Sequence, residues 1–247
     1  MLDITMTATR RPELLVETLT SFTRLMLNEF DQKIRLIINV DPVGHNIPSE
    51  DIVQICKGFF SNVIARCPEQ ASFPQAFRWC WEQTTSPFIF NLEEDWRLLY
   101  PIDLNHMQHL MQTTSELVIL RLPFSPCNLE SNKSWGHFIP WNGAFYEVPT
   151  DSKGLLGFSG HPSLIDRKFV STVLKTGLLD GRRNPEKQLK WRHLHPLQAF
   201  RYGVYGSPGK GAAVVDIGRT WKTEHGWKKV DNAGNNNKAF FTKWETI

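Results

Sequence analysis

The first hundred residues alternate between short segments rich in β-branched residues and longer segments with helical periodicity. The predicted strands are 4–9, 34–40, 62–66 and 88–92. The predicted helices between them are 12–27, 49–60 and 74–83. This alternation predicts an α/β fold with a mixed, mostly parallel sheet flanked by helices. In such folds, ligands bind beyond the carboxyl ends of the strands.

The remaining residues continue the pattern less regularly. Further helices are predicted at 104–111, 164–176 and 185–200, and further strands at 117–122 and 212–217. Residues 123–160 are rich in Pro, Gly, Asn, Ser and aromatic residues, which is typical of loops around a site. With 247 residues and no convincing linker, we expect residues 1–247 to form a single domain.

Composition excludes several classes of protein. No segment approaches the roughly 18 apolar residues of a membrane span. Asp3 interrupts the N-terminal residues and Arg10 soon follows, so they do not resemble a signal peptide. The four cysteines form no Cys-x-x-Cys pair, and we expect reduced, buried thiols. These features predict a cytoplasmic protein without a membrane span.

Charge is divided unevenly along the chain, although the formal net charge is only +3. Residues 1–180 hold 15 Lys and Arg against 20 Asp and Glu, a balance of −5. Residues 181–247 hold 13 against 5, a balance of +8. A basic final quarter indicates either an anionic partner or a solvated basic face.

Three adjacent acids follow the apolar segment 88–92, at the end of a predicted strand. Glu93, Glu94 and Asp95 repel one another, so they need either a compensating cation or free access to water. Carboxylate oxygens are the ligands preferred by Mg²⁺ and Mn²⁺. The pattern therefore indicates a divalent metal site or, alternatively, an acidic turn on the surface.

The order of three strand ends adds to this indication. The first ends in Thr-Ala-Thr-Arg-Arg-Pro over 7–12, the second at Asp41, and the fourth in Asn-Leu-Glu-Glu-Asp over 91–95. Together they resemble the nucleotide-sugar domain of GT-A-fold glycosyltransferases, in which an Asp-x-Asp-type motif holds a metal against the donor diphosphate. The resemblance covers residues 1–100 well and the remainder in outline.

The resemblance implies roles for the acidic residues and for one late histidine. Asp95 and Glu93 correspond to metal ligands for Mn²⁺ or Mg²⁺, with Glu94 beside the donor. His225 is similar in placement to a late His that binds the metal in many enzymes of this fold. The alternative for His225 is a surface histidine without a ligand.

Donor-binding roles are also implied for residues of the N-terminal part. Thr9 and Arg10 correspond to the loop around the nucleotide, and Asp41 to an acid that hydrogen-bonds the base or ribose. Gln75 and Arg78 lie on the helix expected to approach the donor. Structural roles remain open for Asp41 as a turn residue and for Arg78 as a surface residue.

An inverting transferase needs a general base that takes the proton of the acceptor hydroxyl. In this fold the base is usually an acid at the start of a helix, a placement that Glu186 matches because Asn184 and Pro185 favour a helix start there. Asp166 is the second candidate. Glu186 could instead only complement the helix dipole, and a retaining enzyme needs no such base.

Aromatic residues in the loop-rich segment suit sugar binding. Trp135 and Trp141 lie in a Gly- and Asn-containing stretch, and flat aromatic faces stack on sugars or bases. His161 lies in residues 156–163, which resemble the loop of the family that contacts the transferred sugar and the acceptor. All three residues are predicted to bind the acceptor, the alternative being an aromatic core beneath loops.

The resulting hypothesis is a metal-dependent hexosyl- or N-acetylhexosaminyl-transferase, with residues 1–100 binding a nucleotide sugar and residues 101–247 binding the acceptor. A UDP-sugar donor and inversion are expected, with a glycan, a small molecule or DNA as acceptor. The DNA alternative is transfer to a hydroxymethylated base, which the basic C-terminal part would suit. A further alternative is an inactive carbohydrate- or nucleotide-binding module.

Overall fold

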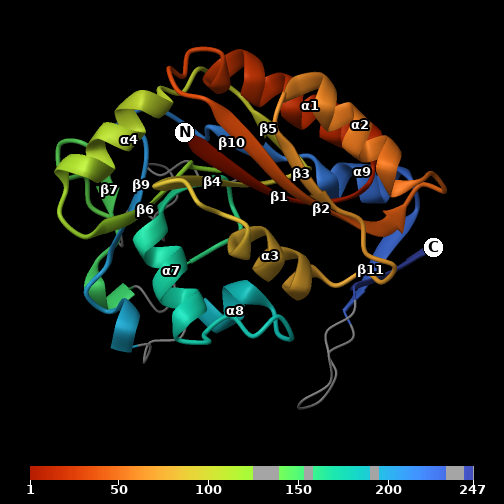
Figure 1. The fold of residues 1–247 in the computed structure, drawn as a ribbon. Coiled ribbons are helices and arrows are strands. Elements are labelled where there is room, and N and C mark those ends of the chain that lie inside the picture. The colour runs from red at the N-terminus through yellow and green to blue at the C-terminus, as the bar shows by residue number, and fades with distance from the viewer. Residues whose placement is uncertain (125–138, 153–157, 190–194, 232–241, 247) are drawn as a thin grey trace.

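The protein is described by a computed structural model (Figure 1). The residues that it describes are 1–124, 139–152, 158–189, 195–231 and 242–246.

The first half of the chain alternates strands and helices as the periodicity predicts. Its elements are β1 (Leu2–Arg10), α1 (Pro12–Phe22), β2 (Ile34–Gly44), α2 (Ser49–Phe59), β3 (Val63–Arg66), α3 (Phe73–Glu82) and β4 (Phe88–Glu93). A π-helical segment, Thr23–Leu27, extends α1 to the predicted end of that helix.

The second half contains more and shorter elements than the sequence predicts. They are β5 (Trp96–Leu98), α4 (Leu104–Thr113), β6 (Leu117–Arg121), β7 (Tyr146–Glu147), β8 (Ser163–Asp166), α7 (Arg167–Lys175), α8 (Pro185–Leu189), β9 (Arg201–Val204), β10 (Val214–Asp216), α9 (Gly218–Glu224), β11 (Trp227–Asp231) and β12 (Thr242–Thr246). Short 3₁₀ turns lie at Thr150–Ser152 and His195–Leu197.

Two predicted helices of the second half are wrong in part. The helix expected over 164–176 begins with a strand, β8, and becomes helical only after Asp166, whose side chain accepts a 2.6 Å hydrogen bond from the backbone N–H of Lys168. The helix expected over 185–200 ends as α8 at Leu189 within the described residues, and the strand β9 follows at Arg201. In both places apolar side chains continue through a change of backbone conformation, so their periodicity did not reveal it.

The central sheet has eight strands in the order β3-β2-β1-β4-β8-β6-β9-β7. β1, β2, β3 and β4 are parallel, and β6 is parallel to β9. β8 is antiparallel to both β4 and β6, and β7 is antiparallel to β9. The sheet is therefore mixed and mostly parallel, as predicted.

Helices cover both faces of this sheet (Figure 1). One face packs against α1, α2 and α4 through a cluster that includes Phe22, Phe90 and Met107. The other packs against α3 and α7 through a cluster that includes Phe77, Ile89 and Phe169. Alternate residues of β4 thus enter opposite clusters, which explains why that strand is apolar almost throughout.

The topology brings several chain ends to one edge of the sheet. β1, β2 and β4 are parallel, so their carboxyl ends lie at the same edge. β8 runs the other way, so the segment before its first residue, Ser163, enters at that edge too. β10 pairs with β5 directly after the acidic residues, with Asp216 opposite Trp96. Segments far apart in sequence therefore meet around Glu93.

None of the helices within the described residues is both long and apolar enough to cross a bilayer.

Candidate active site

A cavity of about 350 Å³ lies at the carboxyl edge of the parallel strands. It is lined by residues from both halves of the chain: Thr7, Ala8, Thr9, Arg11, Asp41, Phe73, Glu93, Glu94, Asp95, Trp96, Gly160, His161, Asn184, Glu186, Asp216, Arg219 and Lys222. The lining combines carboxylates and cations, which suits a polar, charged ligand.

The middle acid of the triplet, Glu94, is buried in an ion pair with Arg11. The exposed fractions of the two side chains are 4% and 3%. Glu94 Oε1 also accepts hydrogen bonds from the backbone N–H of Thr9 at 3.1 Å and from its hydroxyl at 2.8 Å. Burial raises the pKa of Glu94, and the charge of Arg11 opposes that rise. The compensating cation that the acids require is thus supplied in part by Arg11.

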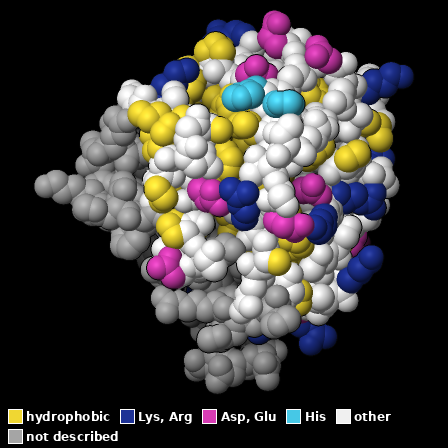
Figure 2. All heavy atoms as spheres, turned by 90° about the vertical axis from the view of Figure 1, so that its left-hand side faces the viewer, with side chains coloured by type: hydrophobic (Ala, Val, Ile, Leu, Met, Phe, Trp, Pro, Cys, Tyr) yellow, Lys and Arg dark blue, Asp and Glu magenta, His cyan; other side chains and the backbone are white. Residues whose placement is uncertain are grey.

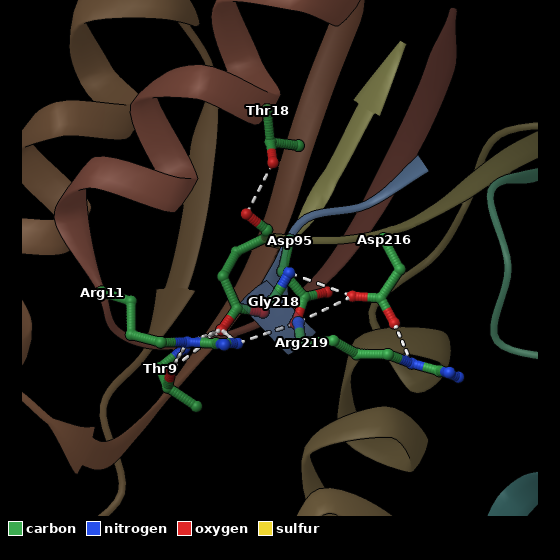
Figure 3. A network of polar contacts seen from close by, with 8 residues as sticks. Thr9, Arg11, Thr18, Asp95, Asp216, Gly218 and Arg219 are labelled. Carbon is green, nitrogen blue, oxygen red and sulfur yellow. Dashed lines mark hydrogen bonds and ion pairs between the residues drawn. The ribbon is translucent and has the colours of Figure 1, made fainter. Parts of the chain in front are cut away.

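The last acid, Asp95, faces the cavity beside the start of α9 (Figure 3). Its Oδ2 lies 3.0 Å from Arg11 Nη2, and its carbonyl accepts a 2.9 Å hydrogen bond from the N–H of Ile217. Gly218 packs directly against the carboxylate, because a Cβ at that position would overlap Oδ2. The absence of a side chain at 218 therefore sets where the carboxylate of Asp95 can lie.

A second acid and two cations reach the same wall from the C-terminal part. Asp216 accepts hydrogen bonds from the backbone N–H of Gly218 at 3.0 Å and of Arg219 at 3.2 Å, and so holds the first turn of α9 (Figure 3). The guanidinium of Arg219 lies 2.9 Å from Asp216 Oδ2. Lys222 follows one turn later and also lines the cavity.

The opposite wall carries Glu186, at the start of α8. Its Oε1 accepts a 2.7 Å hydrogen bond from the N–H of Gly160, whose carbonyl accepts one at 3.1 Å from Asn91 Nδ2. A Cβ on Gly160 would lie 2.7 Å from Glu93 Oε1 and 3.4 Å from Glu186 Oε1. The backbone of Gly160 therefore brings the first acid of the triplet and Glu186 to the same point.

A buried arginine lies close to Glu186. Burial lowers the pKa of Arg121 to about 10, and the negative charge of Glu186 opposes that fall. At neutral pH Arg121 is thus a buried cation beside Glu186.

Asp41 lies at the end of β2, where it lines the cavity but is only 6% exposed. Asn39 Nδ2 donates to its Oδ1 at 2.8 Å, and the N–H of Ser72 donates to its Oδ2 at 3.0 Å. Burial outweighs these hydrogen bonds and raises the pKa of Asp41 to about 6. Asp41 is therefore an acid that titrates near neutrality.

Half of the predicted site residues converge on this cavity. Those in its lining are Thr9, Asp41, Glu93, Glu94, Asp95, His161 and Glu186. The ring of His161 lies 3.9 Å from that of Phe124 and 5.2 Å from that of Trp96, measured between centroids. An aromatic surface therefore borders the polar cavity.

Three residues predicted to bind the donor lie outside the lining. Arg10 donates to Ser49 Oγ at 3.0 Å instead of facing the cavity. Gln75 and Arg78 lie beside Gly181, and Arg78 pairs with Glu82. Successive residues of a strand point to opposite faces, so the turn after β1 directs Arg11 rather than Arg10 toward the acids.

Asp166, the second candidate for the base, lies at the wrong end of the sheet. It pairs with Phe88 at the start of β4, five residues or roughly 17 Å along the strand from Glu93. β8 is antiparallel to β4, so its carboxyl end lies away from the cavity.

The predicted metal ligand His225 and the predicted acceptor residue Trp141 are not part of this cavity. His225 lies with Glu13 and His45, and its Nε2 is 4.0 Å from Glu13 Oε1. Trp141 lines a separate cavity of about 410 Å³ with Tyr100 and Tyr205. Trp135 falls outside the described residues.

Arg11, Asp216 and Arg219 also line the cavity, although none of them was predicted from the sequence. Arg11 stands next to Arg10, and only the tertiary contacts separate their roles. Asp216 had a local signal, because an Asp two residues before Gly218 is a common helix cap.

The comparisons with known proteins rest on structure alone. No family model matches the chain, and no curated protein is significantly similar to it. S. aureus TarS matches with a TM-score of 0.59 and 11% identity, over 87% of this chain and 36% of TarS. TarS 1–349 in complex with UDP-GlcNAc matches with a TM-score of 0.56 and 12% identity, over 87% and 57% of the two chains.

A mannosyltransferase from Pyrobaculum calidifontis, PcManGT in complex with GDP-Man and Mn²⁺, matches with a TM-score of 0.52 and 10% identity. The match covers 85% of this chain and 58% of PcManGT. This chain thus spans less than two thirds of these matched chains. The predicted fold class is confirmed: the chain has the GT-A fold of nucleotide-sugar glycosyltransferases.

Proposed function

We propose that the protein is a metal-dependent glycosyltransferase that moves a hexosyl or N-acetylhexosaminyl group from a UDP-sugar to an acceptor hydroxyl. The observation that carries the proposal is the convergence of Glu93 and Asp95 with Glu186 around one cavity bordered by Arg219 and Lys222. This arrangement offers oxygen ligands, cations for a diphosphate and a base in one place.

The donor diphosphate would lie in the part of the cavity bordered by Asp95 and by the cations of α9. Arg219 and Lys222 border this part of the cavity, and positive charge there stabilises the negative charge that develops on the leaving diphosphate. Asp41, at the end of β2, offers carboxylate oxygens to a ribose or base. The choice of UDP is supported by TarS, which has been described with UDP and with UDP-GlcNAc.

The carboxylates around Asp95 fit Mn²⁺ or Mg²⁺ in the mode in which substrate phosphates complete the coordination. Asp95, Glu93 and Asp216 provide hard oxygen donors, yet no set of three His, Cys, Asp or Glu ligand atoms converges here among the described residues. Asp95 and Glu93 would hold the ion, which when bound polarises the diphosphate as a Lewis acid.

Glu186 is suited to act as the general base of an inverting transfer. Its carboxylate would take the proton of the acceptor hydroxyl while that oxygen bonds to the anomeric carbon and the bond from this carbon to the diphosphate breaks. The N–H of Gly160 holds the carboxylate in place, and the buried cation of Arg121 lies close to it. His161 and Phe73 border the space beside Glu186 and offer surfaces for the acceptor.

The acceptor remains a glycan, a small molecule or a hydroxymethylated base in DNA. Figure 2 shows the face over α4 and β7, where Lys and Arg side chains are interspersed with acidic and hydrophobic ones. This face presents no continuous basic surface among its described residues. It lies at the end of the molecule away from α9 and the cavity, so it does not bear on the choice of acceptor.

Nucleotide release tests the proposed reaction. We would incubate the protein with UDP-, GDP- and ADP-sugars, Mn²⁺, and a panel of acceptors that includes duplex DNA with hydroxymethylated pyrimidines. Chromatography would follow the free nucleoside diphosphate and the glycosylated product. Turnover with UDP-sugars that stops with EDTA is expected. Nucleotide binding without turnover on any acceptor would favour the inactive module.

Glu186→Gln tests the assignment of the base. We expect it to lower kcat by at least about 10²-fold with little change in donor KM, because the donor does not depend on that carboxylate. Asp166→Asn is the matched control, since it makes the same change at the opposite end of the sheet and keeps an Asn cap on α7. Equal effects of the two substitutions would contradict the role of Glu186.

A further inference from the structure

A cluster of three potential metal ligands lies outside the cavity just described. Glu13 belongs to the first turn of α1, His45 follows β2, and His225 ends α9. One ligand atom from each lies within 4.8 Å of the other two. Three segments that are distant in sequence thus place a carboxylate and two imidazoles together.

The spacing of the ligand atoms is close to that of a metal centre. His45 Nε2 lies 2.8 Å from Glu13 Oε1, and His225 Nε2 lies 4.0 Å from the same oxygen. In a tetrahedral Zn²⁺ site with bonds of about 2.0 Å, neighbouring ligand atoms are about 3.3 Å apart. Shifts of under an ångström, in side chains that are 38% to 42% exposed, would reach this spacing.

His225 is already oriented as a ligand. Its Nδ1 lies 2.9 Å from the carbonyl oxygen of Trp221, so the proton is best placed on Nδ1 and the lone pair of Nε2 points toward Glu13. Its ring stacks on the indole of Trp221 at 4.4 Å and 17°. A hydrogen bond donated by the second ring nitrogen to a backbone carbonyl is typical of metal-binding histidines.

Glu13 is held in position in the same cluster. Trp221 Nε1 donates to its Oε1, which leaves further lone-pair positions on the carboxylate for a metal.

We propose that Glu13, His45 and His225 form a Zn²⁺ site that is separate from the Mn²⁺ or Mg²⁺ site at Asp95. Two imidazoles and one carboxylate suit Zn²⁺ better than they suit Mg²⁺, which prefers oxygen ligands. Because the three side chains are partly exposed, water can take the fourth position.

The site would join α9 to α1 and to the end of β2. The same short helix carries Arg219 and Lys222, which line the cavity, and the guanidinium of Arg11 lies 5.4 Å from the ring centroid of Trp221. Bound Zn²⁺ would therefore hold the cations of α9 over the proposed diphosphate site.

Metal titration of protein without a polyhistidine tag tests the proposal. Zn²⁺ binding would be measured by competition with a chromophoric chelator, and Co²⁺ would be added separately to record the visible absorption of a tetrahedral site. We expect one Zn²⁺ per chain, and at least tenfold weaker binding in His45→Ala and in His225→Ala. His109→Ala, an exposed histidine on α4, should bind like the wild type.

Two further measurements separate this site from its alternatives. Asp95→Asn should keep the Co²⁺ absorption, because that carboxylate belongs to the other site. In imidazole NMR spectra of the wild-type protein, Zn²⁺ should shift the Nε2 resonances of His45 and His225. This measurement remains valid even if the alanine variants do not fold. Binding in His45→Ala equal to the wild type, or loss of the absorption in Asp95→Asn, would overturn the proposal.

Discussion

The ion pair between Arg11 and Glu94 joins the end of β1 to the acidic edge of the sheet. Both side chains are almost fully buried, and Thr9 contributes two hydrogen bonds to the same carboxylate. A buried charge that loses its partner is far more costly than a pair replaced as a whole. The pair therefore makes the stability of the fold sensitive to each of its members.

Removal of Arg11 should destabilise the protein strongly. Arg11→Met leaves Glu94 buried without its cation, and we expect the free energy of unfolding to fall by about 3–5 kcal/mol. Urea denaturation followed by circular dichroism would measure this. The double variant Arg11→Met with Glu94→Leu should lose less than the single one. Arg10→Met is the control, and an equal loss there would contradict the special role of Arg11.

Asp41 should make stability depend on pH. Its pKa in the folded protein is about 6, above the ordinary value of 3.8, because burial disfavours the charge. The folded state therefore binds this proton more tightly, and the associated stability is present below pH 3.8 and lost as the pH rises through about 6. The loss amounts to about 3 kcal/mol, since each pKa unit is about 1.4 kcal/mol.

The comparison with Asp41→Asn isolates this effect. We would measure urea unfolding of both proteins between pH 4.5 and 7.5, so that the titration of other groups cancels in the difference. The stability of the wild type relative to the variant should decline across this range. A constant difference would show that Asp41 does not titrate near 6.

At the scale of elements, β10 and α9 place the C-terminal residues against the acidic edge. Gly218 starts α9 in contact with the carboxylate of Asp95, and Asp216 caps the same turn. The geometry of this turn therefore determines the direction of the Asp95 carboxylate and the position of the Arg219 backbone.

Gly218→Ala should displace the carboxylate of Asp95. We expect Mn²⁺ affinity, measured by electron paramagnetic resonance, and metal-dependent turnover to fall at least tenfold, with a loss of stability of about 1–3 kcal/mol from overpacking. Gly211→Ala is a suitable control, because a Cβ there would meet nothing within 4 Å. Unchanged Mn²⁺ binding in Gly218→Ala would contradict the assignment of Asp95.

The elements that could be predicted from the sequence are those with a clear period. β1, β2, β3 and β4 could be predicted because each is a short segment rich in β-branched or apolar residues, bounded by segments of helical period or by turn residues. β9 was missed because Gly203 weakens its strand pattern. The packing requires this glycine, since a Cβ there would clash with the ring of Phe145. β8 was missed because its apolar residues merge with those of α7.

Residues of the candidate site could be predicted where they lie at the end of a predicted strand, as do Asp41 and Asp95. The residues that depend on packing between distant segments were not. Local sequence does not distinguish Arg10 from Arg11, and nothing near His225 indicates that Glu13 and His45 lie beside it. The match of Glu186 came from the resemblance to a known fold together with a helix-start signal.

At the scale of the whole molecule, two apolar clusters share one sheet. β4 contributes Phe90 to one cluster and Ile89 to the other. If β4 left the sheet, apolar side chains of both clusters would therefore become exposed to water. The prediction of a single domain has a direct consequence here, since the two sides should unfold together.

Equilibrium unfolding tests this expectation. Labelling of the thiol of Cys56, a buried residue of α2, reports on one cluster, and Trp81 fluorescence, compared with that of Trp81→Phe, reports on the other. We expect coincident transitions in urea, as in a two-state domain. Separate midpoints would show that the two sides are independent units.

The internal pairing of Arg11 with Glu94 has one more consequence. Since the acids at the sheet edge already have a permanent cation among them, the chain can complete its fold before any metal or nucleotide arrives. A metal and a nucleotide would then bind a protein that is already folded. They could also leave the cavity and bind again without unfolding of the chain.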